Sequence, residues 1–299
     1  MWSVGLAVAA AVTVTLLWVF LGSGSTADAS RLEAVRTASS IVIGAGGAAA
    51  LLLAARRQRY VELDLEQKDH DAGERRVTEL YGKAADQLGS EKAPVRLAGV
   101  YALERLAQNN PEHRQTIVNV LCAYLRMPYT VSRSTAALQE REVRGAAQNV
   151  FESHLRPAEP DTFWPDIDLN LTGATLEWFW FRDCRARNGM FRGTVFHEIA
   201  AFRDSTFTER STFRGARFLS TTDLRRTAFG PRTTDFREAT FDGPTTFGEE
   251  PTHQPRRLDL TAATAAVTPD AERVWPAGWT EEPHDTDPTR VRLIEKDES

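Results

Sequence analysis

Two uninterrupted apolar runs open the chain, and all four charges of the first 55 residues lie between them. Residues 4–21 and 38–55 each contain 18 residues without a charge. A helix of that length measures about 27 Å, close to the roughly 30 Å hydrocarbon core of a bilayer. The pattern therefore predicts a two-span transmembrane anchor over residues 1–59, with spans at about 4–21 and 38–55.

Three arginines directly after the second run, Arg56, Arg57 and Arg59, form the densest positive cluster near either span. By the positive-inside rule, this end faces the cytoplasm. Residues 22–37 then form an outer loop, and both termini and the bulk of the chain lie in the cytoplasm beneath the plasma membrane. A cleaved signal peptide is the alternative for the first run, but it lacks a positive n-region and is long for that role.

The second run also admits a different interpretation. Gly44 and Gly46, followed by Ala49, fit the pattern G-x-G-x-x-A after a short apolar stretch. Residues 60–64 could form a second strand whose acids lie about 20 residues beyond the glycines, as in a dinucleotide-binding βαβ unit. This alternative predicts an enzyme that uses NAD or FAD.

Beyond the apolar runs, residues 60–75 are dense in charge and are expected to form a linker. From residue 76 to 160 the pattern becomes helical, with apolar residues at three- and four-residue spacing. The stripes predict helices at about 77–88, 94–107, 111–124 and 142–155. Each stripe must be buried, so the helices are expected to pack as antiparallel pairs in a small domain.

The strongest signal is a series of large apolar residues over residues 161–250. They are Leu171, Leu176, Phe181, Phe191, Phe196, Phe202, Phe207, Phe213, Phe218, Leu224, Phe229, Phe236, Phe241 and Phe247. From Phe191 onward the steps are 5, 6, 5, 6, 5, 6, 5, 7, 5 and 6 residues. Over the same range, a small residue stands two positions before each large one. One large and one small inward residue per short step predict a narrow solenoid whose stacked coils share a core.

The steps 171–176 (LTGATL) and 213–218 (FRGARF) resemble the A-x-[LF]-x-x unit of the pentapeptide-repeat family. Membership implies a right-handed quadrilateral β-helix with four steps per coil. Residues 84–107 also resemble the helical block that precedes such repeats in actinobacterial membrane proteins. The resemblance thus implies a membrane anchor plus an α+β chain, namely two transmembrane helices, a small helical domain and the β-helix.

The distribution of charge along the chain argues against one known function of such repeats. The whole chain carries −5, but residues 182–237 contain twelve arginines against six acids. Some pentapeptide-repeat proteins mimic duplex DNA to protect a type II topoisomerase, and their rods are acidic; the local charge of +6 argues against that role. Such a face can attract nucleic acid or anionic lipid, or it can simply be a solvated surface. The outward set includes Arg182, Arg185, Arg187, Arg192, Arg203, Arg214 and Arg217.

Apart from the glycine pattern at residues 44–49, no motif for a catalytic, cofactor-binding or metal-binding residue is recognisable, so we expect no such site. Cys184 occupies a small-residue position and is expected to be a buried packing thiol. Residues 178–180 (WFW) are expected to cap the first coils, or to form an exposed interaction surface. Residues 251–299, with ten acids and six basic residues, are expected to supply a capping segment and a largely disordered tail.

Together these features predict a non-enzymatic, membrane-anchored scaffold that displays a solenoid to a protein partner. Its expected partners are the lipid bilayer and an unidentified protein, whereas nucleic acid is not favoured. The alternatives are the dinucleotide-dependent enzyme built on Gly44 and Gly46, and polyanion binding by the arginine face.

Overall fold

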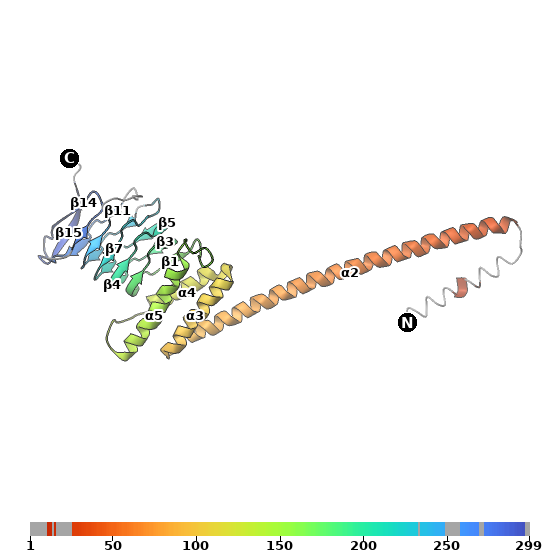
Figure 1. Cartoon of the computed structure of the whole chain (residues 1–299), viewed down its shortest axis with the longest axis horizontal. Coiled ribbons are helices and arrows are strands. Elements are labelled where there is room, and N and C mark those ends of the chain that lie inside the picture. Colours follow the sequence, from red (N-terminus) through yellow and green to blue (C-terminus); the bar gives the residue numbers. More distant parts are fainter. Residues whose placement is uncertain are drawn as a thin grey trace. The chain divides into compact units, whose positions relative to one another are not determined.

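A computed structural model of the chain describes residues 11–13, 15, 26–232, 234–248, 258–268 and 272–296. The chain divides into two compact units, Met1–Arg75 and Arg76–Ser299. Helix α2 (Thr26–Leu88) continues without interruption through the boundary between them (Figure 1).

Helix α2 is longer than the sequence pattern predicted. The expected outer loop falls within α2 from Thr26 onward, and the expected linker at 60–75 is helical. This stretch contains no proline and is rich in alanine, leucine, glutamate and arginine, which have high helix propensity. Gly44 and Gly46 also lie inside the helix, so the dinucleotide-binding interpretation is wrong, because that unit needs a strand and a tight turn there.

Within the described part of the chain, no helix combines the length and apolar character needed to span a bilayer. The first predicted span, 4–21, lies almost entirely outside the described residues. The backbone of the second, 38–55, belongs to α2, but only Ser40, Gly47 and residues 50–55 have described side chains.

A small helical region precedes the solenoid. It consists of α3 (Ala93–Asn109), the 3-10 turn η1 (Pro111–His113), α4 (Arg114–Arg126) and α5 (Thr135–His154). Helix α5 begins at Thr135 rather than near residue 142, because the Ser134 hydroxyl caps it by accepting from the Ala137 amide at 3.2 Å. The final turns of α2 pack against α3, where Gly99 permits close approach: a Cβ there would lie 2.7 Å from the Leu88 nitrogen.

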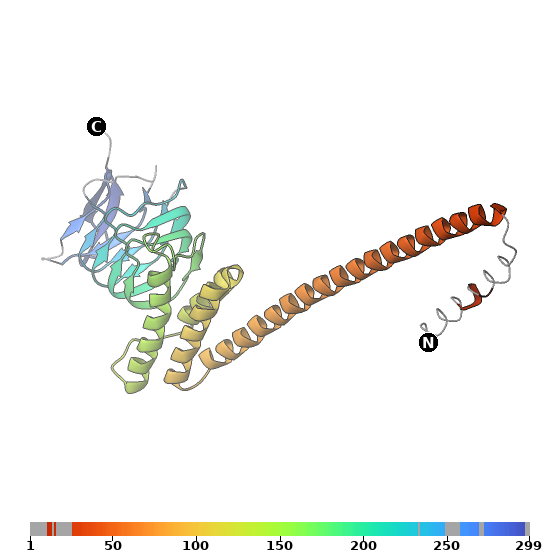
Figure 2. The ribbon, with the colours of Figure 1, turned by 45° about the vertical axis from the view of Figure 1, so that its right-hand side comes forward.

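The second half of the chain is a β-solenoid of about four turns, consistent with the pentapeptide-repeat fold. Its strands are β1 (Asp168–Asn170), β2 (Thr175–Trp180), β3 (Arg185–Met190), β4 (Val195–Ala201), β5 (Thr206–Thr212), β6 (Arg217–Phe218), β7 (Thr222–Asp223), β8 (Thr234–Asp235), β9 (Thr240–Phe241), β10 (Thr245–Thr246), β11 (Leu258–Asp259), β12 (Thr264–Ala266) and β13 (Arg273–Val274). They pair in parallel, each with the strand one coil away, as the stacked rungs of Figure 2 show.

Strand register places the large apolar residues in vertical columns. Phe191, Phe213 and Phe236 form one column, with ring centroids 4.8 and 4.6 Å apart and nearly parallel planes. Phe196, Phe218 and Phe241 form a second, with separations of 4.8 and 4.9 Å. These separations match the spacing of hydrogen-bonded strands, so each ring stacks on the ring of the coil below.

The corners of the five-residue steps share one backbone conformation. A residue at positive φ stands two positions after the large residue wherever a five-residue step follows, as at Gly173, Asp204 and Gly215 (φ 71°, 60° and 64°). This left-handed residue turns the chain in the shortest distance. The six-residue step from Phe196 to Phe202 also has a left-handed residue, Glu198 (φ 60°), and its extra residue shifts the register of the β2–β4 pairing.

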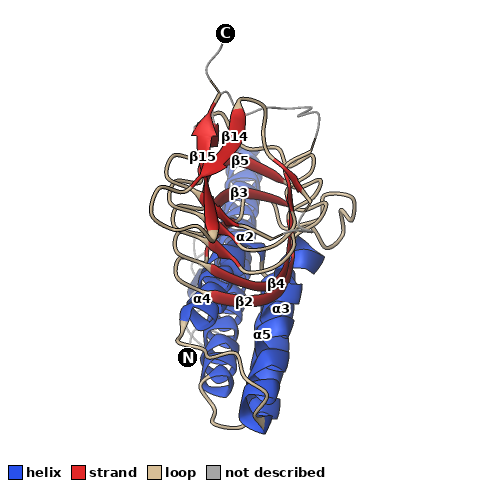
Figure 3. Ribbon diagram, turned by 90° about the vertical axis from the view of Figure 1, so that its left-hand side faces the viewer, coloured by secondary structure: helices blue, strands red, loops and turns tan. Residues whose placement is uncertain are grey.

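Both ends of the solenoid are covered, as Figure 3 shows, with helices at one end and a hairpin at the other. The hairpin consists of β14 (Trp279–Pro283) and β15 (Arg290–Glu295), and β15 pairs antiparallel to β12. The expectation of a largely disordered tail is therefore wrong over 258–268 and 272–296. The reason is that Leu260, Ala263 and Ala265 continue the buried columns, while Trp275 packs on Phe247.

Candidate interaction surface

The interior of the solenoid is filled by side chains. Thirteen of the fourteen predicted inward residues are buried, and Phe229 is half-buried against the same core. Small residues beside them close the remaining space and bond to the coil below: the Thr194 hydroxyl donates to the Leu171 carbonyl at 2.7 Å, and Thr227 to Phe202 at 2.9 Å. The outer faces and the two capped ends are therefore where this domain can meet another molecule.

Ion pairs on the outer faces bind neighbouring coils together. Arg226 donates both Nε and Nη2 to Asp204, one coil away, at 2.6 and 2.7 Å. Arg187 pairs similarly with Asp168, and Arg214 reaches Glu238 at 2.6 Å. Hydrogen bonds from Arg187 and Arg226 hold the pKa values of Asp168 and Asp204 below the usual range.

Half of the twelve arginines of 182–237 have a carboxylate partner, and half do not. In the described part of the chain, the six that form no ion pair are Arg182, Arg185, Arg192, Arg210, Arg217 and Arg232, and all six are exposed. Arg182 lies over the Trp180 ring, 4.7 Å from its centroid. The positive charge of this segment is thus partly neutralised and partly free.

Three of the free arginines lie close to the sheet β1-β3-β5-β8-β11: Arg210 belongs to β5, Arg192 follows β3 and Arg232 precedes β8. Two adjoining depressions cross its outer face, with volumes of about 480 and 610 Å³. Arg192 lines the first and Arg232 the second, while Arg210 and the exposed Met190 line both. We call the first of these depressions the arginine groove. The residues that define it are Met190, Arg192, Arg210, Arg214, Asp235 and Arg237.

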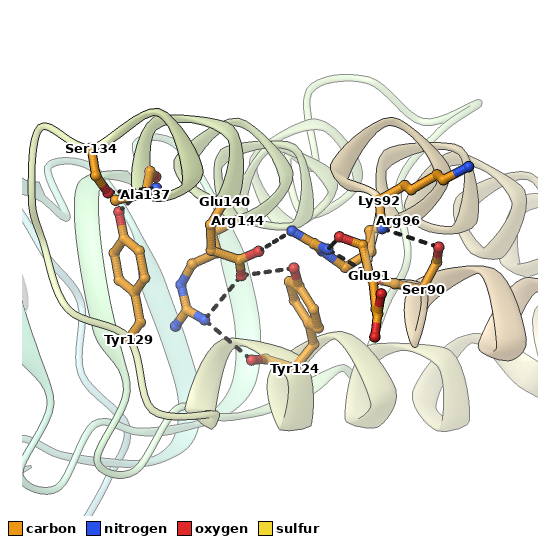
Figure 4. A network of polar contacts seen from close by, with 10 residues as sticks. All are labelled: Ser90, Glu91, Lys92, Arg96, Tyr124, Tyr129, Ser134, Ala137, Glu140 and Arg144. Atoms are coloured by element: carbon orange, nitrogen blue, oxygen red, sulfur yellow. Dashed lines mark hydrogen bonds and ion pairs between the residues drawn. The ribbon is translucent and has the colours of Figure 1, made fainter.

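A polar network joins α3, α4 and α5 of the helical region (Figure 4), and its Arg144 also bonds to the first coil. The buried guanidinium of Arg144 donates to the carbonyls of Tyr124, Leu125 and Thr175, the last of which belongs to β2. Glu140 accepts from the Tyr124 hydroxyl at 2.7 Å and from Arg96 at 2.8 Å. Arg144 thus supplies a donor to the Leu125 carbonyl at the end of α4 and to the Thr175 carbonyl at the start of β2, while the Tyr124 carbonyl also accepts from the Met127 amide.

The aromatic segment 178–180 divides between the two expected roles. Phe179 is buried among the core rings, 5.5 Å from Phe202 between centroids. Trp178 is 41% exposed, has φ 47°, and lies under the Arg141 guanidinium at 5.2 Å. A single residue therefore completes the core while its neighbour faces solvent.

Both cysteines are free and buried. Burial raises the pKa of Cys184 to about 12, so its thiol stays protonated at neutral pH. Cys184 occupies the position of a small inward residue, beside the Arg182 carbonyl. Among the described residues, no group of three His, Cys, Asp or Glu side chains could hold a metal ion.

Several buried residues fall outside the predicted core. Leu260 and Ala265 extend two columns by one coil, and the stretch 258–265 (LDLTAATA) parallels 169–176 (LNLTGATL), which is the signal that identifies them. Arg144 offers no comparable signal, because its acceptors lie 19 to 31 residues away.

Comparison of the chain with protein-family models, curated proteins and solved structures gives no match. The function of the protein is therefore inferred from the geometry of the repeat and the chemistry of its surface.

Proposed function

We propose that this protein is a non-enzymatic scaffold, anchored in the plasma membrane, that presents its capped solenoid to a protein partner in the cytoplasm. The observation that carries the proposal is the filled interior. Stacked rings occupy the space inside the coils, and caps close both ends, which leaves the outer faces as binding surfaces. Repeat solenoids generally use such extended outer surfaces for binding.

The exposed apolar part of α2 supports the anchor. Leu51, Leu52 and Leu53 are consecutive and 67–73% exposed. Consecutive residues point about 100° apart around a helix, so the three side chains span about 200° and one partner helix could not cover all of them. Lipid covers all sides at once, and Arg56, Arg57 and Arg59 follow where headgroups would accept positive charge.

Crosslinking in membranes tests the scaffold role. The tagged full-length chain is crosslinked in native membranes, purified in detergent, and its co-purifying proteins are compared with those of a chain lacking residues 161–299. The proposal predicts a protein recovered repeatedly with the full chain and lost with the truncated one. Repeated recovery of no specific protein would contradict it.

A further inference from the structure

The arginine groove combines free positive charge with an exposed apolar side chain. Among the described residues Arg192 and Arg210 form no ion pair, and both line the same depression as Met190, which is 38% exposed. Arg214 and Arg237 complete the lining but already bond to Glu238 and Asp235. The groove therefore offers two uncommitted guanidinium groups around one apolar contact.

The same lining disfavours a dense polyanion. Asp235 and Asp259 lie in the depression with the arginines, so its four arginines and two aspartates leave an excess of +2. The described residues that line the two depressions include no aromatic side chain on which a nucleic-acid base could stack. A continuous row of phosphates would place negative charge beside Asp235 and Asp259, whereas a segment with a few separate carboxylates can direct them to Arg192 and Arg210 alone.

An acidic protein segment fits these features better. Guanidinium groups match carboxylates with two parallel hydrogen bonds. Methionine is flexible and polarizable, and it adapts to apolar side chains of varied shape. A partner segment with carboxylates on either side of one apolar residue would satisfy Arg192, Arg210 and Met190 together.

We propose that the arginine groove is the docking site for an acidic, extended segment of the partner protein, with an apolar side chain placed on Met190. This inference rests on the proposed scaffold function and specifies which face of the solenoid the partner meets.

Fluorescence anisotropy of the full-length chain in detergent tests the inference. The probe is a fluorescein-labelled peptide of glutamate and serine with one central leucine. The double variant R192E/R210E should weaken its binding by about tenfold or more, since two attractive charges become repulsive. The matched control is R185E/R217E, which makes the same charge change at two exposed arginines. In the described part of the chain these two form no ion pair, and they do not line the groove. The control should alter the affinity for the peptide by less than about twofold.

Two further arms separate the contributions. The Met190→Ser variant should weaken binding of the leucine peptide but not of a peptide with serine in its place. Single-stranded oligothymidylate should bind less tightly than the peptide at the same salt concentration.

Equal losses in both double variants, no binding of the peptide, or tighter binding of the oligonucleotide would overturn the inference. The membrane crosslinking experiment, repeated with R192E/R210E, distinguishes this failure from failure of the scaffold role. A partner that crosslinks to the wild-type chain and to R192E/R210E equally would refute the groove while leaving the scaffold intact.

Discussion

Phenylalanine rings are the residues that hold the coils in register. In the columns of Phe191 and Phe196 each ring stacks on the ring below, and full burial of such a side chain contributes roughly 1.5–3 kcal/mol before chain entropy is subtracted. Phe213 lies in the middle of its column, 4.8 Å from Phe191 and 4.6 Å from Phe236. Leucine occupies the ends of the same column, at 171 and 260, so an aliphatic side chain also fits.

The Phe213→Ala substitution should therefore lower the free energy of unfolding by about 3–5 kcal/mol, because it leaves a cavity between two stacked rings. Phe213→Leu should cost less than about 1.5 kcal/mol. Denaturant unfolding of the purified chain in detergent measures both. Equal costs for the two variants would show that ring stacking and cavity volume do not govern this position.

Glycines differ sharply in what surrounds them. A Cβ at Gly230 would lie 2.2 Å from the Glu209 carbonyl oxygen of the coil below, whereas a Cβ at Gly145 in α5 would meet nothing within 4 Å. Gly230→Ala should cost at least about 2 kcal/mol because backbone must move. Gly145→Ala should stabilise by about 0.5–1 kcal/mol through helix propensity. The same unfolding assay checks the opposite signs; a stable Gly230→Ala chain would refute the close contact between coils.

At the level of elements, ion pairs and caps join coils that are locally separate. The carboxylates of Asp168 and Asp204 have lowered pKa values because arginines of the adjacent coil bond to them. The unfolded chain, with aspartate pKa near 3.9, then binds more protons than the folded chain. The stabilisation is present above that pKa and is lost as pH falls below about 4.

Thermal unfolding between about pH 6 and pH 3 should show this loss as a falling Tm. The Asp204→Asn variant should be less stable at pH 6, yet its Tm should decline less steeply towards pH 3. A variant that keeps the acid sensitivity of the wild-type chain would show that the Arg226–Asp204 pair contributes nothing to it.

The helical cap depends on Arg144. Arg144→Met should lower the free energy of unfolding by roughly 3 kcal/mol, because the Leu125 and Thr175 carbonyls lose the Arg144 donor, whereas the Tyr124 carbonyl keeps the Met127 amide. Arg133→Met, at an exposed arginine that forms no ion pair in the described part of the chain, should change it by less than about 0.5 kcal/mol. Denaturant unfolding of the wild-type chain and of both variants measures these changes. Equal effects of Arg144→Met and Arg133→Met would contradict a structural role for Arg144.

Sequence reasoning succeeded where structure depends on local repetition. The regular five- and six-residue spacing from Phe191 to Phe247 identified the inward residues, because each of them follows from the position of the one before it. It failed where the repeat is interrupted, since the segment between Phe247 and Leu258 breaks the period and hides the last coil. It could not place the arginine groove, because pairs such as Arg226–Asp204 depend on register between coils.

At the scale of the whole molecule, the chain has one compact unit made of a helical region and a closed solenoid, and another that contains most of α2. The helix continues where hydropathy suggested a loop and a linker, because local helix propensity is high and no proline interrupts it. The proposed scaffold requires that the apolar runs of the first unit insert in the membrane while the solenoid remains on the cytoplasmic side.

Alkaline carbonate extraction of membranes that carry the full-length chain, followed by protease treatment of right-side-out and inverted vesicles, tests this requirement most directly. We expect the chain to stay in the membrane pellet and the protease to remove the solenoid only in inverted vesicles. Release of the chain into the supernatant, or cleavage of the solenoid in right-side-out vesicles, would contradict it.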